Sequence, residues 1–176
     1  MKTLLMISFM AAGLHAQNTP SQNNLLTAEL KRFYEGSRNN IMRSAEKVPE
    51  SGYSFKPADG VRTFGELIAH AAEYQMIVCS GVKGEQQANP AAGKTSKEDL
   101  IAALKTSSAY CDALYDSLTD AALAQPSKLF GRDVSKQGAL YFNVIHNNED
   151  YGTMVPYMRM QKIVPPSSEP RGAAKK

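Results

Sequence analysis

The sequence has no tryptophan and only two cysteines among its 176 residues. It contains no C-x-x-C pair, so a thiol redox centre or a zinc knuckle is not expected. No run reaches the roughly eighteen uninterrupted apolar residues that a membrane span requires. Strand-like alternation and internal repeats are also missing. With 43% hydrophobic and 21% charged residues, the composition indicates one ordinary globular domain.

Positive and negative charges are also nearly balanced. The formal net charge is +3; Lys2 contributes one of these charges and residues 169–176 contribute two, so the rest of the chain is neutral. Nucleic-acid binding needs a concentrated basic face, which a neutral domain does not offer. We therefore expect no nucleic-acid partner, whereas a small-molecule substrate and a homodimer stay open.

The N-terminal stretch has the pattern of a cleavable signal peptide. Lys2 precedes an apolar run over residues 4–14, and the small residue Ala16 is followed by polar Gln17. We expect residues 1–16 to be a signal peptide and residues 17–23 a polar spacer. The mature protein is then exported, to the periplasm or the medium.

The two cysteines, Cys79 and Cys111, agree with export. An oxidising compartment favours a disulfide between them. The alternative is a pair of buried thiols that act as small hydrophobic side chains. A bridge requires that the segments carrying them be neighbours in the fold.

Four segments have apolar residues at spacings of three and four, which predicts amphipathic helices. They cover about 24–48, 63–80, 95–118 and 136–161. The connections at about 81–93 and 119–135 contain no predicted strand. We expect an all-α fold, a four-helix bundle over residues 24–164, followed by a disordered basic tail over 165–176.

Local signals set the helix ends. Pro49 terminates the first helix, and T-x-x-E capping boxes at Thr63 and Thr95 begin the second and third. Pro156 lies inside the fourth helix, where it predicts a bend just past Asp150. The predicted buried faces are Leu26, Leu30, Phe33, Ser37, Ile41, Ala45 and Val48 in the first helix; Phe64, Leu67, Ile68, Ala71 and Val78 in the second; Leu100, Ala103, Leu104, Cys111, Leu114 and Leu118 in the third; and Leu140, Val144, Tyr151, Met154, Val155 and Met158 in the fourth.

Chemistry-bearing side chains lie at the margins of two of these faces. His146 and Asp150 are four residues apart in the fourth helix and share one flank with Asn143 and Tyr157. His70 lies beside the apolar face of the second helix. Such a set suits a metal ion between helices. A His–Asp salt bridge or a hydrogen-bonded structural histidine fits the same spacing.

The wider pattern resembles a known family. Y-S-F-K-P at residues 53–57, T-F-G-E-L-I-A-H at 63–70, H-N-N-E-D-Y-G from His146 and Y-M-R-M-Q-K-I-V-P-P-S from Tyr157 are similar to the DinB-like metalloenzymes, over nearly the whole chain after residue 16. The resemblance implies a left-handed four-helix bundle with a long crossover connection. It also implies a metal on three histidines, of which His70 and His146 match two.

The third histidine of the family falls on Asp150 in this sequence. A carboxylate binds Zn, Ni, Mn or Fe, so His70, His146 and Asp150 can form a divalent-metal site with open positions. Because aspartate is shorter than histidine, the ion could shift toward the fourth helix, a water could bridge, or the site could have lost its metal. Glu149 and Tyr157 are further acid–base candidates, although geometry favours a solvated Glu149.

Two functions follow from the resemblance. The first is a metal-dependent hydrolase or transferase acting on a small substrate, since a metal with open positions activates a water or a thiol. Enzymes similar to some family members activate low-molecular-weight thiols, but those thiols are cytosolic, which weakens the analogy for an exported chain. The second is a noncatalytic helical protein that binds a metal or an apolar ligand at a degenerate site.

Overall fold

The computed structural model describes residues 24–170 and is mostly helical. Four long helices dominate: α1 (Leu25–Lys47), α2 (Phe64–Lys83), α3 (Lys97–Ser117) and α5 (Lys136–Met160). Within residues 24–170, no helix is both long and apolar enough to cross a bilayer. The shorter elements are the 3-10 turns η1 (Glu50–Gly52) and η2 (Pro166–Ser168), the helix α4 (Asp120–Leu123) and the strands β1 (Pro126–Leu129) and β2 (Arg132–Ser135).

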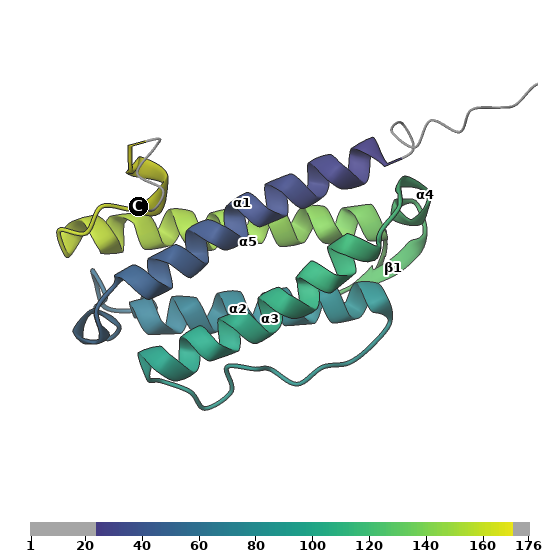
Figure 1. Ribbon diagram of the computed structural model, residues 1–176. Helices are drawn as coiled ribbons and strands as arrows, with labels where there is room; N and C mark the ends of the chain where they lie inside the picture. Colours follow the sequence, from purple (N-terminus) through teal and green to yellow (C-terminus); the bar gives the residue numbers. More distant parts are fainter. Residues whose placement is uncertain (1–23, 171–176) are drawn as a thin grey trace, which may run out of the picture.

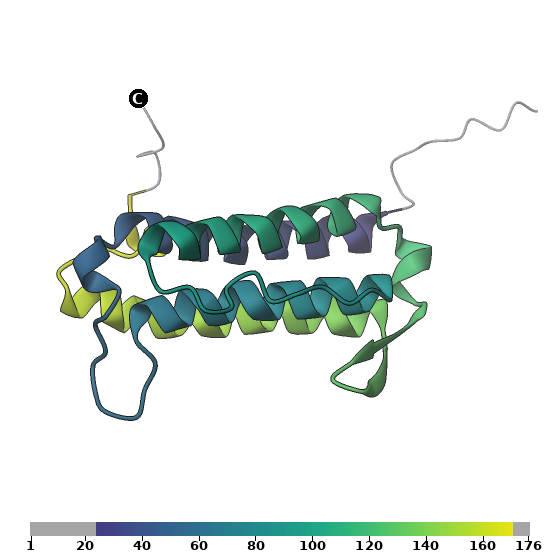
Figure 2. The same ribbon diagram turned by 90° about the horizontal axis from the view of Figure 1, so that it is seen from below.

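The long helices form two layers, with α1 and α3 in one and α2 and α5 in the other (Figure 2). The connection over 84–96 runs back along the bundle, so α2 and α3 point the same way (Figure 1). This is the predicted crossover. α2 packs against both α3 and α5. The handedness of the bundle stays a prediction.

One of the two predicted capping boxes is confirmed. At the start of α2 the Glu66 amide donates to the Thr63 hydroxyl at 3.2 Å, and the Glu66 carboxylate accepts from the Thr63 amide at 2.6 Å. The predicted cap of α3 at Thr95 is wrong by one residue. Ser96 is the cap instead, and its hydroxyl accepts from the Asp99 amide at 3.1 Å.

The all-α prediction is wrong in the connection over 119–135. It contains α4 and an antiparallel hairpin of β1 and β2, with Pro126 opposite Ser135 and Leu129 opposite Arg132. The two-residue turn has positive φ at both positions, 50° at Phe130 and 78° at Gly131, which matches a type I′ hairpin turn. Four-residue strands are too short to produce a clear alternating pattern, so the sequence did not reveal them.

The predicted buried faces of α2 and α3 are confirmed, and the prediction for the first helix is wrong only at two of its seven residues. Leu30, Ser37, Ile41, Ala45 and Val48 are buried as predicted. Leu26 and Phe33 are exposed, and the next residues, Thr27 and Tyr34, are buried in their place. Tyr34 stacks on Tyr115 with ring centroids 4.1 Å apart. These partners explain why the polar residues face inward: the Thr27 hydroxyl donates to Asp120 at 2.7 Å and the Tyr34 hydroxyl to the Ser108 carbonyl at 3.2 Å.

A polar layer separates the apolar core into two clusters, one at each end of the bundle. Every long helix contributes to this layer near its middle. Gln75, fully buried, has no hydrogen-bond partner for either amide atom within residues 24–170. The members are Ser37, Gln75, Ser107, Ser108 and Asn147.

Gln75→Met is expected to raise the free energy of unfolding by about 1 kcal/mol, because a buried polar group without a partner is destabilising by roughly 1 to 3 kcal/mol. Urea unfolding measures the change. The matched control is Gln86→Met at an exposed position, which should have no effect. A less stable Gln75→Met protein would contradict this expectation and indicate that internal water satisfies the amide.

The disulfide prediction is confirmed. Cys79 in α2 and Cys111 in α3 are bonded, with Cα atoms 5.4 Å apart, inside the range that a bridge allows. Both residues are fully buried in the cluster near the hairpin. The bridge therefore ties the two parallel helices together at that end.

The C-terminal prediction needs one correction, and two others stay open. Pro166 in η2 is buried, and Glu169 pairs with Lys47 at 2.6 Å, so the predicted start of a disordered tail at residue 165 is wrong. α5 continues past Pro156 to Met160, and the bend stays a prediction. The predicted signal peptide and spacer, and residues 171–176, lie outside the described residues.

Candidate metal centre

Three predicted residues meet between α2 and α5. His70 lies in the second turn of α2, and His146 and Asp150 lie one turn apart in α5. One possible ligand atom from each residue can be chosen so that all three lie within 4.8 Å of one another. The prediction that they converge is therefore confirmed. The site is at the level of the polar layer, next to Asn147.

His146 and Asp150 are spaced as two ligands of one metal ion would be. Nδ1 of His146 lies 3.2 Å from Oδ2 of Asp150, and the side chains are 12% and 8% exposed. The approach is within ion-pair range but lacks hydrogen-bond geometry, and both atoms are buried without a hydrogen-bond partner in the part of the chain that the structure describes. Donor atoms that share one ion lie roughly 3 to 4 Å apart. The residues present thus fit a divalent cation.

His70 is half-buried at the same site. Burial lowers the pKa of His70, and the Asp150 carboxylate opposes that shift. A neutral imidazole keeps a free lone pair, which is the form that binds a metal. The environment of His70 is thus compatible with a ligand role.

Two aromatic side chains that were not predicted as part of the site, Tyr74 and Phe142, lie beside the histidines. Tyr74 stacks on His146 with centroids 4.4 Å apart and an interplanar angle of 5°, and it lies 4.3 Å from the His70 ring. Phe142 lies 5.4 Å from His146. Helical spacing could have revealed both, since Tyr74 follows His70 by four residues and Phe142 precedes His146 by four.

The other polar residues that the sequence singled out in the fourth helix have different environments. Glu149 is exposed, as expected. Tyr157 is buried, and its hydroxyl donates to the Arg62 carbonyl at 2.8 Å. Asn143 donates to the Tyr115 hydroxyl at 3.3 Å. These bonds give Tyr157 and Asn143 structural partners away from the ligand set.

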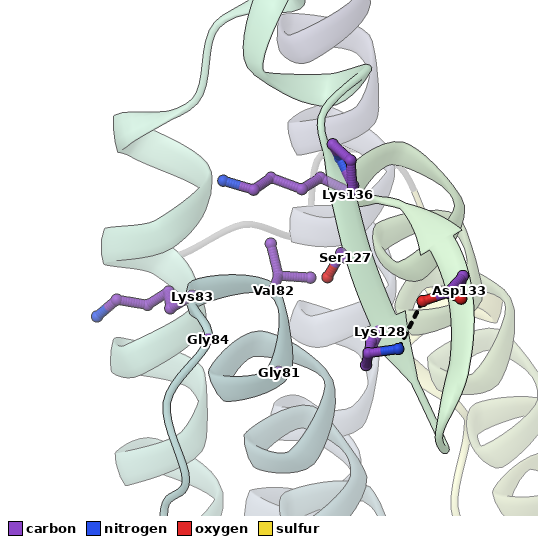
Figure 3. A pocket seen from close by; sticks show the side chains of 9 residues that line it. Gly81, Val82, Lys83, Gly84, Ser127, Lys128, Asp133 and Lys136 are labelled. Carbon is purple, nitrogen blue, oxygen red and sulfur yellow. Dashed lines mark hydrogen bonds and ion pairs between the residues drawn. The ribbon is translucent and has the colours of Figure 1, made fainter.

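Two cavities lie at different distances from the histidines. One of about 480 Å³ lies between the end of α2 and the hairpin (Figure 3) and contains none of the three converging residues. Its Lys128 pairs with Asp133 at 2.6 Å. Another, of about 550 Å³, is lined by Leu67 and Thr153. These two residues are one helical turn from His70 and Asp150, so the second cavity is nearer to the site.

A family comparison confirms the resemblance that the sequence motifs indicated. A profile of the DinB superfamily matches residues 34–154. The chain belongs to the DinB superfamily. The match covers the segments that carry His70, His146 and Asp150. Among curated proteins, none matches the chain.

Solved structures with the DinB fold are similar to the chain. A DinB-like protein from Bacillus cereus has a TM-score of 0.69 at 20% identity, over 79% of this chain and 95% of that one. A DinB-like protein from Bacillus subtilis has a TM-score of 0.61 at 21% identity, over 76% and 92%. The mycothiol-dependent maleylpyruvate isomerase has a TM-score of 0.58 at 15% identity, over 72% and 59%. At these identities the likeness concerns the fold.

Proposed function

We propose that this DinB-superfamily protein holds a divalent metal on His70, His146 and Asp150 and acts as a metal-dependent hydrolase or transferase on a small substrate. The observation that carries the proposal is the pair of buried donor atoms, His146 Nδ1 and Asp150 Oδ2, which have no hydrogen-bond partner among residues 24–170. Unpaired buried polar atoms are destabilising, and a shared cation would satisfy both.

The donor set limits the metal and its chemistry. Two imidazoles and one carboxylate suit Zn, Ni, Mn or Fe, and three protein ligands leave open positions for substrate. A divalent metal there supplies Lewis acidity, which makes water or a thiol nucleophilic at neutral pH. The chain's part is to orient the ligands: Tyr74 stacks on the His146 ring and restricts its rotation.

The dimensions around the site support a small substrate. The cavity of about 550 Å³ lined by Leu67 and Thr153 begins one turn from the ligands, and small-molecule sites span roughly 300 to 1,000 Å³. Arg62 also lines this cavity. A hydrolase would use water as the nucleophile, and a transferase would use a thiol.

The substitution of Asp150 for the family histidine supports the second candidate function. A shorter ligand leaves a weaker site, and a protein with such a site could bind a metal or an apolar ligand without catalysis. Such a protein would keep the fold and the contact between the His70 and His146 rings, whose centroids are 5.0 Å apart. It would have no turnover.

Metal-restored turnover tests the catalytic proposal. Chelator-treated protein should be inactive, and one equivalent of Zn, Ni, Mn or Fe should restore activity toward an activated ester or toward an electrophile with a low-molecular-weight thiol. His70→Ala should stay inactive after the same treatment. Protein that binds the metal stoichiometrically but turns over neither class of substrate would favour the noncatalytic alternative.

We further propose that the protein is exported after removal of residues 1–16. The buried Cys79–Cys111 disulfide supports this proposal, because such bonds persist in oxidising compartments. Mass spectrometry of the exported protein should give a chain that begins near Gln17. A chain that retains residues 1–16 outside the cytoplasm would contradict it.

A further inference from the structure

Phe130 at the tip of the β1–β2 hairpin has an unfavourable conformation for its residue type. Its φ is 50°, a region that type I′ turns usually fill with asparagine, aspartate or glycine. The residue is 55% exposed. A bulky aromatic residue that is both strained and exposed stabilises the turn less than asparagine would. Such residues concentrate at functional sites.

Phe130 contacts two aromatic side chains that in turn contact a proposed metal ligand. Its ring lies 5.9 Å from Tyr74 and 5.3 Å from Phe142, the latter edge to face. Tyr74 and Phe142 in turn contact His146. The hairpin extends from the α2–α5 layer on the side away from α1 and α3 (Figure 2). Three separate elements, α2, α5 and the hairpin, thus contribute one ring each beside the same site.

We propose that Tyr74, Phe130 and Phe142 form an aromatic surface that holds a planar apolar ring of the substrate while another group of that substrate reaches the metal. This inference rests on the proposed function and narrows its substrate to small molecules with an aromatic ring. Rings pack on aromatic side chains edge to face or offset, and the exposed Phe130 ring offers such a contact. The hairpin tip would then determine specificity rather than catalysis.

Two metal-binding probes separate the ring contact from the metal contact. Benzohydroxamate and acetohydroxamate chelate a metal through the same group and differ in one phenyl ring. With zinc-loaded protein we expect benzohydroxamate to bind about tenfold more tightly, as one aromatic contact allows. Calorimetry measures both dissociation constants.

Phe130→Asn removes the ring and introduces a residue that favours positive φ, so the hairpin should still form. The preference for benzohydroxamate should fall to about threefold or less, with acetohydroxamate affinity unchanged. The matched control is Phe33→Asn in α1, where the phenylalanine is 52% exposed and α1 lies in the other layer. This control should keep the tenfold preference. Circular dichroism verifies that both variants are folded.

Different outcomes would overturn the aromatic surface and the proposed metal-dependent function. Equal binding of the two hydroxamates by the wild type, or a preference that survives Phe130→Asn, would overturn the aromatic surface and leave the metal site intact. Failure to take up zinc, or to bind either hydroxamate, would overturn the proposed function and this inference with it.

Discussion

His146→Ala should lower the affinity for a divalent metal by at least about 100-fold, since loss of outer partners of a ligand alone costs about 10- to 100-fold. The imidazole provides Nδ1, which lies 3.2 Å from the Asp150 carboxylate and has no hydrogen-bond partner within the described residues 24–170. Competition with a chelating dye measures the affinity. Helical circular dichroism should be unchanged, because most of the core lies in the two apolar clusters.

Adjacent carboxylates provide a matched control for the third ligand. Asp150 is buried, whereas Glu149 faces solvent. Asp150→Asn should weaken metal binding strongly and Glu149→Gln should not. Asp150→His, which restores the family pattern, should tighten binding if aspartate is the weakest ligand. Equal affinities for all three variants would place Asp150 outside the ligand set.

Removal of the disulfide by Cys79→Ala together with Cys111→Ala should lower the free energy of unfolding by about 3 to 4 kcal/mol, the loop-closure contribution for its length. The bridge spans 32 positions in sequence, including the crossover connection. For a domain of this size the melting temperature should fall by roughly 10 °C. Thermal unfolding followed by circular dichroism measures the shift.

Reduction provides the control for the disulfide prediction. A reducing agent should lower the melting temperature of the wild type toward that of the double variant and leave the double variant unchanged. A wild type that melts at the same temperature with and without reductant would contradict a stabilising role. The effect on metal affinity should be small, because the bridge belongs to the cluster near the hairpin and His70 lies more than two turns before Cys79 in α2.

The sequence predicted the long helices and the site because both depend on local spacing. Apolar periodicity fixed α2 and α3, the Thr63 capping box began α2, and Pro49 followed the end of α1. His146 and Asp150 are neighbours in any helix. Spacing also placed His70 at the margin of its own apolar face, which suited a metal between helices. The resemblance to the DinB-like family then favoured this set over a structural histidine, since periodicity alone does not state which helices face each other.

The remaining features depend on tertiary contacts that periodicity does not contain. Tyr34 is buried in place of Phe33 because it stacks on Tyr115, a residue far away in sequence. The hairpin has four-residue strands, and Phe130 is not a usual turn residue. Neither feature could be predicted from periodicity, so the hairpin that carries the exposed Phe130 ring was not expected.

The metal content of the protein, purified without a metal-binding tag, tests the central claim most directly. Elemental analysis should find close to one equivalent of a transition metal per chain in the wild type, and less than about a tenth of an equivalent in folded His70→Ala protein. A wild type that contains no metal and takes up none when Zn, Ni, Mn or Fe is supplied would contradict the account. Equal metal in the wild type and in His70→Ala would contradict the ligand assignment.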